Sequence, residues 1–312
     1  MLPSKARRPP GGPIRWGEAG RAADVARLCV VEARPQVQGV FLLRFAAGAA
    51  LAVPGRAEAG AIAVGAVAWW CAVVCVYLLN GVTDVAEDRA NASRRPVARG
   101  DLPVRAAARV TAAAAVTALC LAAGGGLLGW TAVFLVLGWV YSAPPVAAKR
   151  WSVSCSAVVF AMGWSGYAAG AAVSGGGLTR TGLVFAAAMS AWMALVGAVV
   201  KDLADTYGDA VGGRRTLAAL RGPGAARRMA VTGAVLVGAG APLASLALAP
   251  AALPGTVPLA AGAVWVVAEC LRLDATGPGD RRARRGGYRA FMTTQYAANS
   301  AMLTTVLAGE WG

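Results

Sequence analysis

Two short segments of this sequence gather acidic residues at spacings that suit a divalent cation. The first segment holds an amide and two carboxylates at intervals of four residues: Asn80, Asp84 and Asp88. The second holds three carboxylates at intervals of three and four residues: Asp202, Asp205 and Asp209. On a helix, each spacing places the side chains on one face, where like charges repel. A bound Mg²⁺ would remove that repulsion, because it takes carboxylate oxygens together with phosphate oxygens and water.

Basic residues follow each acidic segment. They are Arg89, Arg94, Arg95 and Arg99 after the first segment, and Arg214 and Arg215 after the second. A guanidinium group binds phosphate through two parallel hydrogen bonds, so carboxylates beside arginines indicate a site for metal and phosphate together. Either segment alone is explained as well by solvated loop charges. Two matching segments favour a shared site.

The elements that must position these residues are hydrophobic helices. Of the 312 residues, 57% are hydrophobic and 14% are charged, whereas soluble domains average about 25% charged residues. A bilayer-spanning helix needs about 20 apolar residues. Nine apolar runs suit such helices, the fourth being short: residues 37–53, 61–79, 106–123, 127–140, 153–173, 181–200, 229–248, 252–271 and 290–307. The chain is therefore predicted to be an all-α, polytopic membrane protein with nine transmembrane helices.

The distribution of positive charge predicts the orientation of these helices. Nearly all of the 30 Lys and Arg residues fall in the segments that share a side with the N-terminus; the exceptions are Arg44, Arg56, Arg109 and Arg180. By the positive-inside rule that side is cytoplasmic. We expect residues 1–35 to form a basic cytoplasmic tail and residues 36–312 the transmembrane domain. Both acidic segments then face the cytoplasm, in a multi-pass protein of the cell (plasma) membrane.

Composition also excludes several classes of site. The net charge of +15 is explained by topology and contact with anionic lipid, so no nucleic-acid partner is expected. Histidine is absent, which excludes His metal ligands and a Ser-His-Asp triad. The six cysteines are scattered without paired spacing, which is typical of small packing residues.

Three motifs, in order along the chain, resemble those of the UbiA superfamily of intramembrane prenyltransferases. The first consists of Asn80, Asp84 and Asp88, followed by Arg95-Pro96 and Gly100. The next is Tyr141-Ser142 with Pro144-Pro145 and Lys149-Arg150. The last is Lys201, Asp202, Asp205 and Asp209. The resemblance covers the chain from about residue 37 to the end.

This resemblance implies nine helices around a central cavity open to lipid, capped by cytoplasmic loops. It implies that Mg²⁺ and an allylic diphosphate are held by Asn80, Asp84, Asp88, Asp205 and Asp209. The phosphate oxygens would be contacted by Arg94 and Lys149, with Arg95 and Lys201 as further candidates, and Asp202 belongs to the predicted substrate-binding set. Tyr141 would lie near the carbon–oxygen bond that breaks. The catalytic set is thus Asp84, Asp88, Asp205, Asp209 and Tyr141.

One departure from the superfamily pattern bears on the substrate. Many quinone-pathway members carry Asp directly after the Asn and Arg directly after the middle Asp, where this chain has Gly81 and Val85. The difference argues against a simple ubiquinone or menaquinone assignment and suits specialised metabolism.

Two activities stay open. A prenyltransferase would move a geranyl to geranylgeranyl group to a small, aromatic acceptor, whereas a terpene cyclase would close the chain on itself. A transporter would place ionisable residues deep in its helices, which only Arg44 clearly does.

A few residues inside the predicted spans have two interpretations each. Arg44 either faces the cavity and receives an anionic acceptor or phosphate, or reaches the headgroups along the lipid surface. Gln295 and Asn299, four residues apart, either line the cavity or join helices. Aromatic rings that could stabilise an allylic cation, or simply pack, include Trp69, Trp139, Trp164 and Tyr167.

Overall fold

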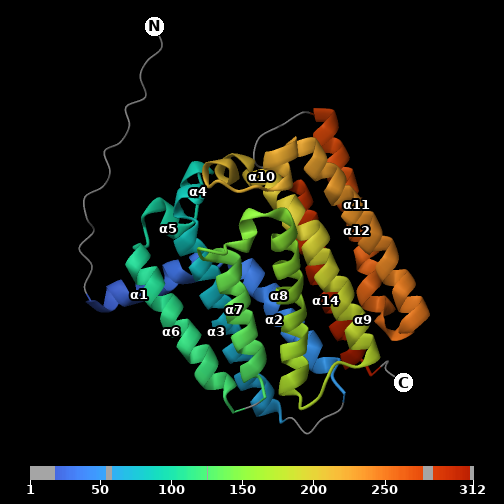
Figure 1. Cartoon of the computed structure of the whole chain (residues 1–312). Coiled ribbons are helices and arrows are strands. Elements are labelled where there is room, and N and C mark those ends of the chain that lie inside the picture. Colours follow the sequence, from blue (N-terminus) through green and yellow to red (C-terminus); the bar gives the residue numbers. More distant parts are fainter. Residues whose placement is uncertain (1–17, 54–57, 125, 277–283, 310–312) are drawn as a thin grey trace.

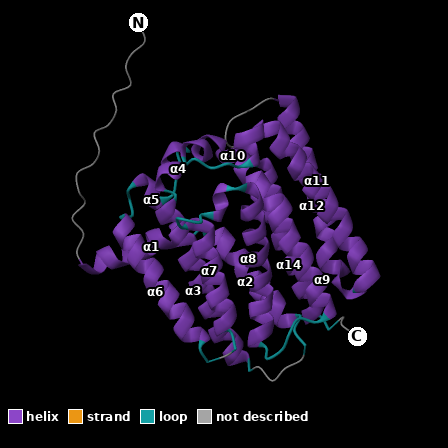
Figure 2. Ribbon diagram, viewed as in Figure 1, coloured by secondary structure: helices purple, strands orange, loops and turns teal. Residues whose placement is uncertain are grey.

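The computed structural model describes residues 18–53, 58–124, 126–276 and 284–309, and these ranges are helical almost throughout (Figure 1). Figure 2 shows helices joined by loops, without strands in the described ranges. Extended pairing there is limited to two single-residue bridges, Ala52 with Leu178 and Trp151 with Arg215. The predicted all-α class is therefore confirmed.

The helices follow one another closely along the chain. Their bounds are α1 Glu18–Glu32, α2 Pro35–Ala50, α3 Ala59–Thr83, α4 Val85–Ala90, α5 Pro96–Arg99, α6 Val104–Ala122, α7 Leu128–Ser142, η1 Ala148–Arg150, α8 Ser152–Val173, α9 Arg180–Trp192, the π-helical turn η2 Met193–Gly197, α10 Ala198–Val211, α11 Leu217–Leu248, η3 Pro250–Ala252, α12 Leu253–Thr276 and α14 Gly286–Leu307. The long α11 is broken at Gly222, whose φ is 82°.

Each predicted span falls on helical structure; residues 181–200 lie on α9, η2 and the start of α10. Within the described ranges, six helical segments are long and apolar enough to cross a membrane: Ala59–Thr83, Val104–Ala122, Ser152–Val173, Arg180–Leu203, Leu217–Leu248 and Pro250–Leu273. The chain is thus an integral membrane protein by length and composition of its helices. The count of nine spans and the cytoplasmic N-terminus stay predictions.

The helices pack in two groups that share α2 and α8. One apolar core lies among α2, α3, α6, α7 and α8, and the other among α9, α11, α12 and α14. Helices α2 and α8 approach closely where Gly48 faces the backbone of Tyr167 and Gly170 faces the backbone of Phe45. A Cβ at either glycine would overlap that backbone. Small residues at such crossings let membrane helices pack without a hydrophobic driving force between them.

The short helices gather at one end of the bundle. Helices α4, α5 and α10 lie at the upper end in Figure 1, and the loop between α8 and α9 lies at the opposite end. Helix α4 packs against α10, while α1 packs against α3 and α5. This end carries both acidic segments, so the fold brings together groups that lie more than 100 residues apart in the sequence.

Candidate active site

Asp84 lies at the centre of a buried polar cluster. It ends α3 and begins α4, and its Oδ2 accepts hydrogen bonds from Asn80 Nδ2 (2.9 Å) and Arg214 Nη2 (3.0 Å). Its Oδ1 accepts a hydrogen bond from Lys149 Nζ. Burial by itself would raise the pKa of Asp84, but the charges of Lys149 and Arg214 lower it overall. The Asp84 carboxyl is therefore held ionised.

Arg214 joins the two acidic segments. Besides Asp84, its Nη2 donates to the carboxylate of Glu87, and its Nε lies 3.5 Å from Asp209 Oδ1. Burial raises the pKa of Asp209 to about 7 against the opposing charge of Arg214. The other oxygen of this carboxyl, Oδ2, is buried without a hydrogen-bond partner in the described part of the chain.

Helices α4 and α10 touch through side chains that fill the space above two glycines. The Gly208 amide donates to Asn91 Oδ1 (2.8 Å), and Asn91 Nδ2 donates to the Asp205 carbonyl (3.3 Å). A Cβ at Gly208 would overlap Asn91, and one at Gly212 would overlap Glu87. Gly208 and Gly212 thus allow the first acidic segment to approach the second.

Arg95 holds the first acidic segment in place. Its Nη1 donates to Asp88 Oδ2 (2.9 Å) and Asn80 Oδ1 (3.4 Å), and its Nε forms an ion pair with Glu32 Oε1 (2.7 Å). Glu32, at the end of α1, is fully buried. Gly81 provides the room, because a Cβ there would overlap the Glu32 carboxylate and Arg95.

The segment after α7 brings a buried lysine to the cluster. Lys149, in η1, donates to Thr83 Oγ1 (3.1 Å) as well as to Asp84. Burial lowers its pKa, an effect that Asp84 opposes. The segment is tied to the end of the second acidic segment by a hydrogen bond from the Arg215 amide to the Arg150 carbonyl (2.7 Å).

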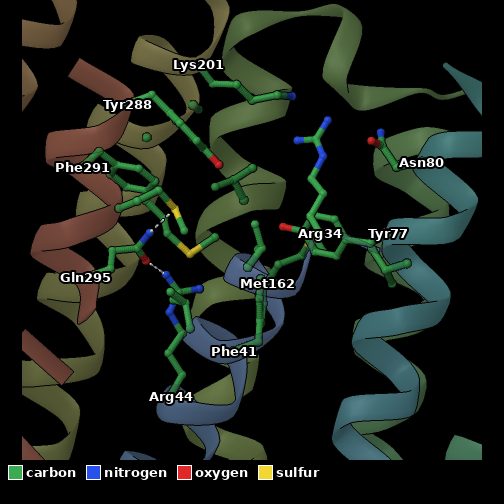
Figure 3. A pocket seen from close by; sticks show the side chains of 18 of the residues that line it. Arg34, Phe41, Arg44, Tyr77, Asn80, Met162, Lys201, Tyr288, Phe291 and Gln295 are labelled. Carbon is green, nitrogen blue, oxygen red and sulfur yellow. Dashed lines mark hydrogen bonds between the residues drawn. The ribbon is translucent and has the colours of Figure 1, made fainter. Parts of the chain in front are cut away.

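A cavity extends from this cluster into the bundle (Figure 3). Polar side chains line its mouth: Arg34, Asn80, Tyr141 and Lys201. Apolar and aromatic side chains line its walls: Val40, Phe41, Val76, Tyr77, Met162, Met193, Tyr288, Phe291 and Met292. At the mouth, Lys201 Nζ donates to Tyr141 OH (3.3 Å). Arg44 and Gln295 lie at the far end, which we call the cavity floor.

Arg34 supplies a further charge at the mouth. It precedes α2 with φ at 58°, a left-handed conformation that costs a non-glycine residue energy and is typical of functional positions. Burial opposes its charge, but Tyr288, Asp88 and Asp205 raise the pKa of Arg34 overall. A carboxylate from each acidic segment therefore stabilises the charged form of the Arg34 guanidinium.

The structure gathers most of the predicted site residues at one end of the bundle. Four line the cavity: Asn80, Tyr141, Lys201 and Arg44. Five lie in the α4, α10 and η1 cluster: Asp84, Asp88, Asp209, Arg95 and Lys149. Asp205 lies on α10 where Asn91 contacts its backbone. Two lie apart from the cavity, because Arg94 is exposed between α4 and α5 and Asp202 lines a second cavity beside Cys155 and Leu217.

Several residues that form the polar cluster or line the cavity were not identified from the sequence. They are Glu32, Arg34, Asn91 and Tyr288, while Glu87 and Arg214 were noted only as neighbouring charges. Gly81 carried a signal for Glu32, since a small residue beside Asn80 leaves room for another side chain. Of the candidate rings, Trp69 and Tyr167 are fully buried in the cores, Trp164 packs partly buried against one core, and Trp139 is exposed; none of the four lines the cavity.

The donor chemistry of the cluster fits Mg²⁺. All of its ligand candidates offer oxygen, the donor that Mg²⁺ prefers, and the unpartnered Asp209 Oδ2 is such a donor. No set of three or more acidic or cysteine side chains in the described ranges already forms a metal site. Lys149 and Arg214 take up the oxygens of Asp84 instead. Binding a metal there requires these two cations to turn toward phosphate oxygens.

Comparison with known proteins identifies the family and the fold. Residues 41–294 match the UbiA prenyltransferase family. The chain belongs to the UbiA prenyltransferase family. Among solved structures, a UbiA homologue from Archaeoglobus fulgidus has a TM-score of 0.63 at 18% identity, covering 90% of this chain and 98% of that one. The same homologue bound to DMAPP and Mg²⁺ gives 0.60 at 17% identity, over 87% and 99% of the two chains.

Two further matches differ in how much of the chain they cover. A structure described for digeranylgeranylglyceryl phosphate synthase has a TM-score of 0.61 at 13% identity and covers 91% of this chain and 99% of that one. The homogentisate phytyltransferase of Synechocystis sp. (strain ATCC 27184 / PCC 6803 / Kazusa) is 38% identical over 86 residues. That stretch spans only 26% of this chain and 28% of the phytyltransferase. At these identities the structural likeness establishes the fold.

Proposed function

We propose that this chain is a Mg²⁺-dependent intramembrane prenyltransferase that ionises an allylic isoprenyl diphosphate and transfers the prenyl group to a small aromatic acceptor. One observation carries the proposal. Asn80 contacts Asp84 and also lines the cavity mouth, and Arg214 joins Asp84 to Asp209. A diphosphate bound at both acidic segments would therefore direct its prenyl chain into the apolar cavity.

The residues at the mouth have separate roles in this proposal. Asn80, Asp84, Asp88, Asp205 and Asp209 would hold Mg²⁺. The bound metal supplies positive charge that stabilises the diphosphate as it departs. The neighbouring cations Lys149, Lys201 and Arg34 would neutralise phosphate oxygens from the protein side.

The cavity wall suits the chemistry that follows. The allylic C–O bond breaks with its electron pair left on the diphosphate, and the acceptor ring supplies the pair for the new C–C bond. The ring then loses a proton, which the released diphosphate can accept. The rings of Tyr77 and Tyr141 line the space in which the allylic cation would form, and aromatic faces stabilise cations. The Met and Val side chains of the wall limit access of water.

The proposal is tested with purified protein in lipid nanodiscs, Mg²⁺ and geranyl, farnesyl or geranylgeranyl diphosphate, with and without phenolic acceptors. Diphosphate and organic products are measured together. Release of diphosphate that depends on an acceptor, with a prenylated acceptor as product, is the expected result. A cyclic hydrocarbon or alcohol formed without acceptor would replace the proposal with a terpene cyclase. Failure to release diphosphate with any substrate would refute both.

A chelator provides the matched control for the metal. Removing Mg²⁺ is expected to stop diphosphate release, and adding it back to restore release. Activity that persists at full rate in excess chelator would contradict the metal requirement.

A further inference from the structure

A second cavity of about 230 Å³ lies between the starts of α8 and α11, with η2 and α10 as its inner wall. It shares the lining residue Ala198 with the main cavity but is separate from it. Val153 and Met229 also line it, and they are 84% and 44% exposed. Because α8 and α11 are long and apolar enough to cross a membrane, this exposed side faces lipid. The second cavity therefore opens toward the bilayer at the end of the bundle that carries α10 (Figure 1).

Asp202 is the charged residue in the lining of the second cavity. It is half-buried, and it forms neither a hydrogen bond nor an ion pair with any residue in the described ranges. The two cations that act on its charge have other partners, because Lys201 donates to Tyr141 and Arg214 pairs with Asp84. A carboxylate withdrawn from water is costly without a partner. The second cavity therefore suits a ligand that brings a positive charge and N–H donors.

The two hydroxyl groups of the lining already have partners. Ser152 Oγ accepts a hydrogen bond from the Leu217 amide (2.8 Å), and Ser156 Oγ donates to the Ala194 carbonyl (2.9 Å). Much of the remaining lining is apolar. An occupant must therefore combine one cationic group with an apolar part.

Two exposed arginines, Arg150 and Arg215, flank the second cavity, and we call them the rim arginines. Each stands two residues before a lining residue, Ser152 and Leu217 respectively. The Arg215 amide donates to the Arg150 carbonyl (2.7 Å), and the Arg215 guanidinium lies over the Trp151 ring, 4.7 Å from the centroid. Neither arginine forms an ion pair with a residue that the structure describes. Free positive charge thus lies beside the unpaired carboxylate.

We propose that the second cavity binds the headgroup of an aminophospholipid, phosphatidylethanolamine, from the adjacent leaflet. Its ammonium group donates to Asp202, its phosphate meets the rim arginines, and its acyl chains leave past Val153 and Met229 into the bilayer. This order of charges matches the zwitterion, since guanidinium binds phosphate and carboxylate binds ammonium. An anionic headgroup without an amine would leave Asp202 unpaired. A diphosphate would be repelled by the same carboxylate.

A lipid in this position joins α8, α10 and α11. Helix α10 carries the second acidic segment at the same end of the bundle. The bound headgroup therefore supports that segment from outside the main cavity, whichever reaction the main cavity performs. The inference does not depend on the proposed function.

The first test compares headgroups on the wild-type protein. Delipidated protein in detergent is titrated with phosphatidylethanolamine, its N-methyl and N,N-dimethyl forms, phosphatidylcholine and phosphatidylglycerol, all with the same acyl chains. Native mass spectrometry measures the bound lipid. Affinity should fall stepwise as N–H donors are lost, and phosphatidylcholine should bind about 10-fold more weakly than phosphatidylethanolamine, as for lost hydrogen bonds to a charged group. Equal binding across the series, or tightest binding of phosphatidylglycerol, overturns the inference.

Variants then assign the preference to the second cavity. Asp202→Asn should abolish it, and Ala218→Leu, which fills part of the cavity, should reduce it. Replacing both Arg150 and Arg215 with Gln should weaken all of these phospholipids alike and leave the preference for the amine. Asp101→Asn is the control, because Asp101 is an exposed carboxylate outside the cavity, and it should bind as the wild type does. An undiminished preference in both Asp202→Asn and Ala218→Leu contradicts the proposed site.

Discussion

At the scale of single residues, the position of the Glu32 side chain explains why a glycine stands at position 81. The superfamily pattern often has an aspartate directly after the motif asparagine, and this chain has Gly81 there. The space above Gly81 is occupied by the Glu32 carboxylate, which reaches in from α1 and pairs with Arg95. A carboxylate is thus present beside Asn80 although the sequence motif lacks it. The helix before the first predicted span contributes to the site.

The Glu32–Arg95 pair should therefore matter for stability and turnover together. Glu32→Gln removes one of the two carboxylates that pair with the buried Arg95 guanidinium and leaves Asp88 as the other. We expect the free energy of unfolding to fall by about 3 kcal/mol. Turnover should fall as well, because Arg95 holds Asp88 and Asn80. Unfolding is followed by tryptophan fluorescence in a detergent titration. An unchanged unfolding midpoint would show that the pair is not formed.

Asp209 allows the metal assignment to be tested with little structural disturbance. Its only ion pair in the described ranges is the long contact with Arg214, and its Oδ2 is unpartnered. Asp209→Asn should lower diphosphate release by about 100-fold, the cost of removing one group that stabilises the departing charge. Helix content and unfolding should change little.

Asp101→Asn is the matched control for that measurement. Asp101 belongs to the same end of the bundle, but it is exposed, and its ion pair among the described residues is with the exposed Arg99. An exposed pair contributes little, so turnover should stay at the wild-type level. Equal losses in Asp101→Asn and Asp209→Asn would refute the assignment of Asp209 to the metal.

At the scale of elements, the contact between α4 and α10 couples the two acidic segments. Gly208→Ala would place a methyl group against Asn91 and push the helices apart. We expect lower turnover and a loss of about 1–3 kcal/mol of stability, as for other overpacked sites. Gly240→Ala on α11 is the control, since a Cβ there meets open space. Wild-type turnover in Gly208→Ala would show that the coupling is unimportant.

Sequence periodicity predicted the second acidic segment better than the first. Lys201 to Asp209 lie on one continuous helix, α10, as the spacing indicated. The spacing of the first segment likewise indicated one helix, yet the helix stops at Thr83 and restarts at Val85. Asp84 lies between them and bonds to Lys149 and Arg214, contacts that only tertiary structure supplies. Aspartate favours helix ends because its side chain competes with the backbone.

The individual site residues also differ in whether sequence spacing could identify them. Asn80, Asp84 and Asp209 were found from spacing, because one helix turn separates polar groups that act together. Asn91 and Glu32 carried no such pattern, since their partners lie on other helices. Spacing also could not show that Lys201 and Asp202, adjacent in sequence, point into different cavities.

At the scale of the whole molecule, the predicted topology places the α4, α5 and α10 end in the cytoplasm. Labelling tests this. In a Cys120→Ser background, which removes the exposed native cysteine, Gly177→Cys lies in the loop before α9 and Arg99→Cys lies in α5. A membrane-impermeant thiol reagent should label the first from outside the cell and spare the second. The reverse pattern would invert the orientation.

Arg34, directly before α2, and Arg44, within α2, place a positive charge at each end of the cavity. Arg34 and Arg44 are ten residues apart, which corresponds to about 15 Å along a helix, and they mark the mouth and the floor. A carbocation that migrated along the prenyl chain toward the floor would approach the charge of Arg44 and rise in energy. In the proposed reaction, we therefore expect positive charge to stay on the first carbons beside the diphosphate. For the proposed prenyl transfer, we therefore expect a product whose prenyl chain is linear and unrearranged.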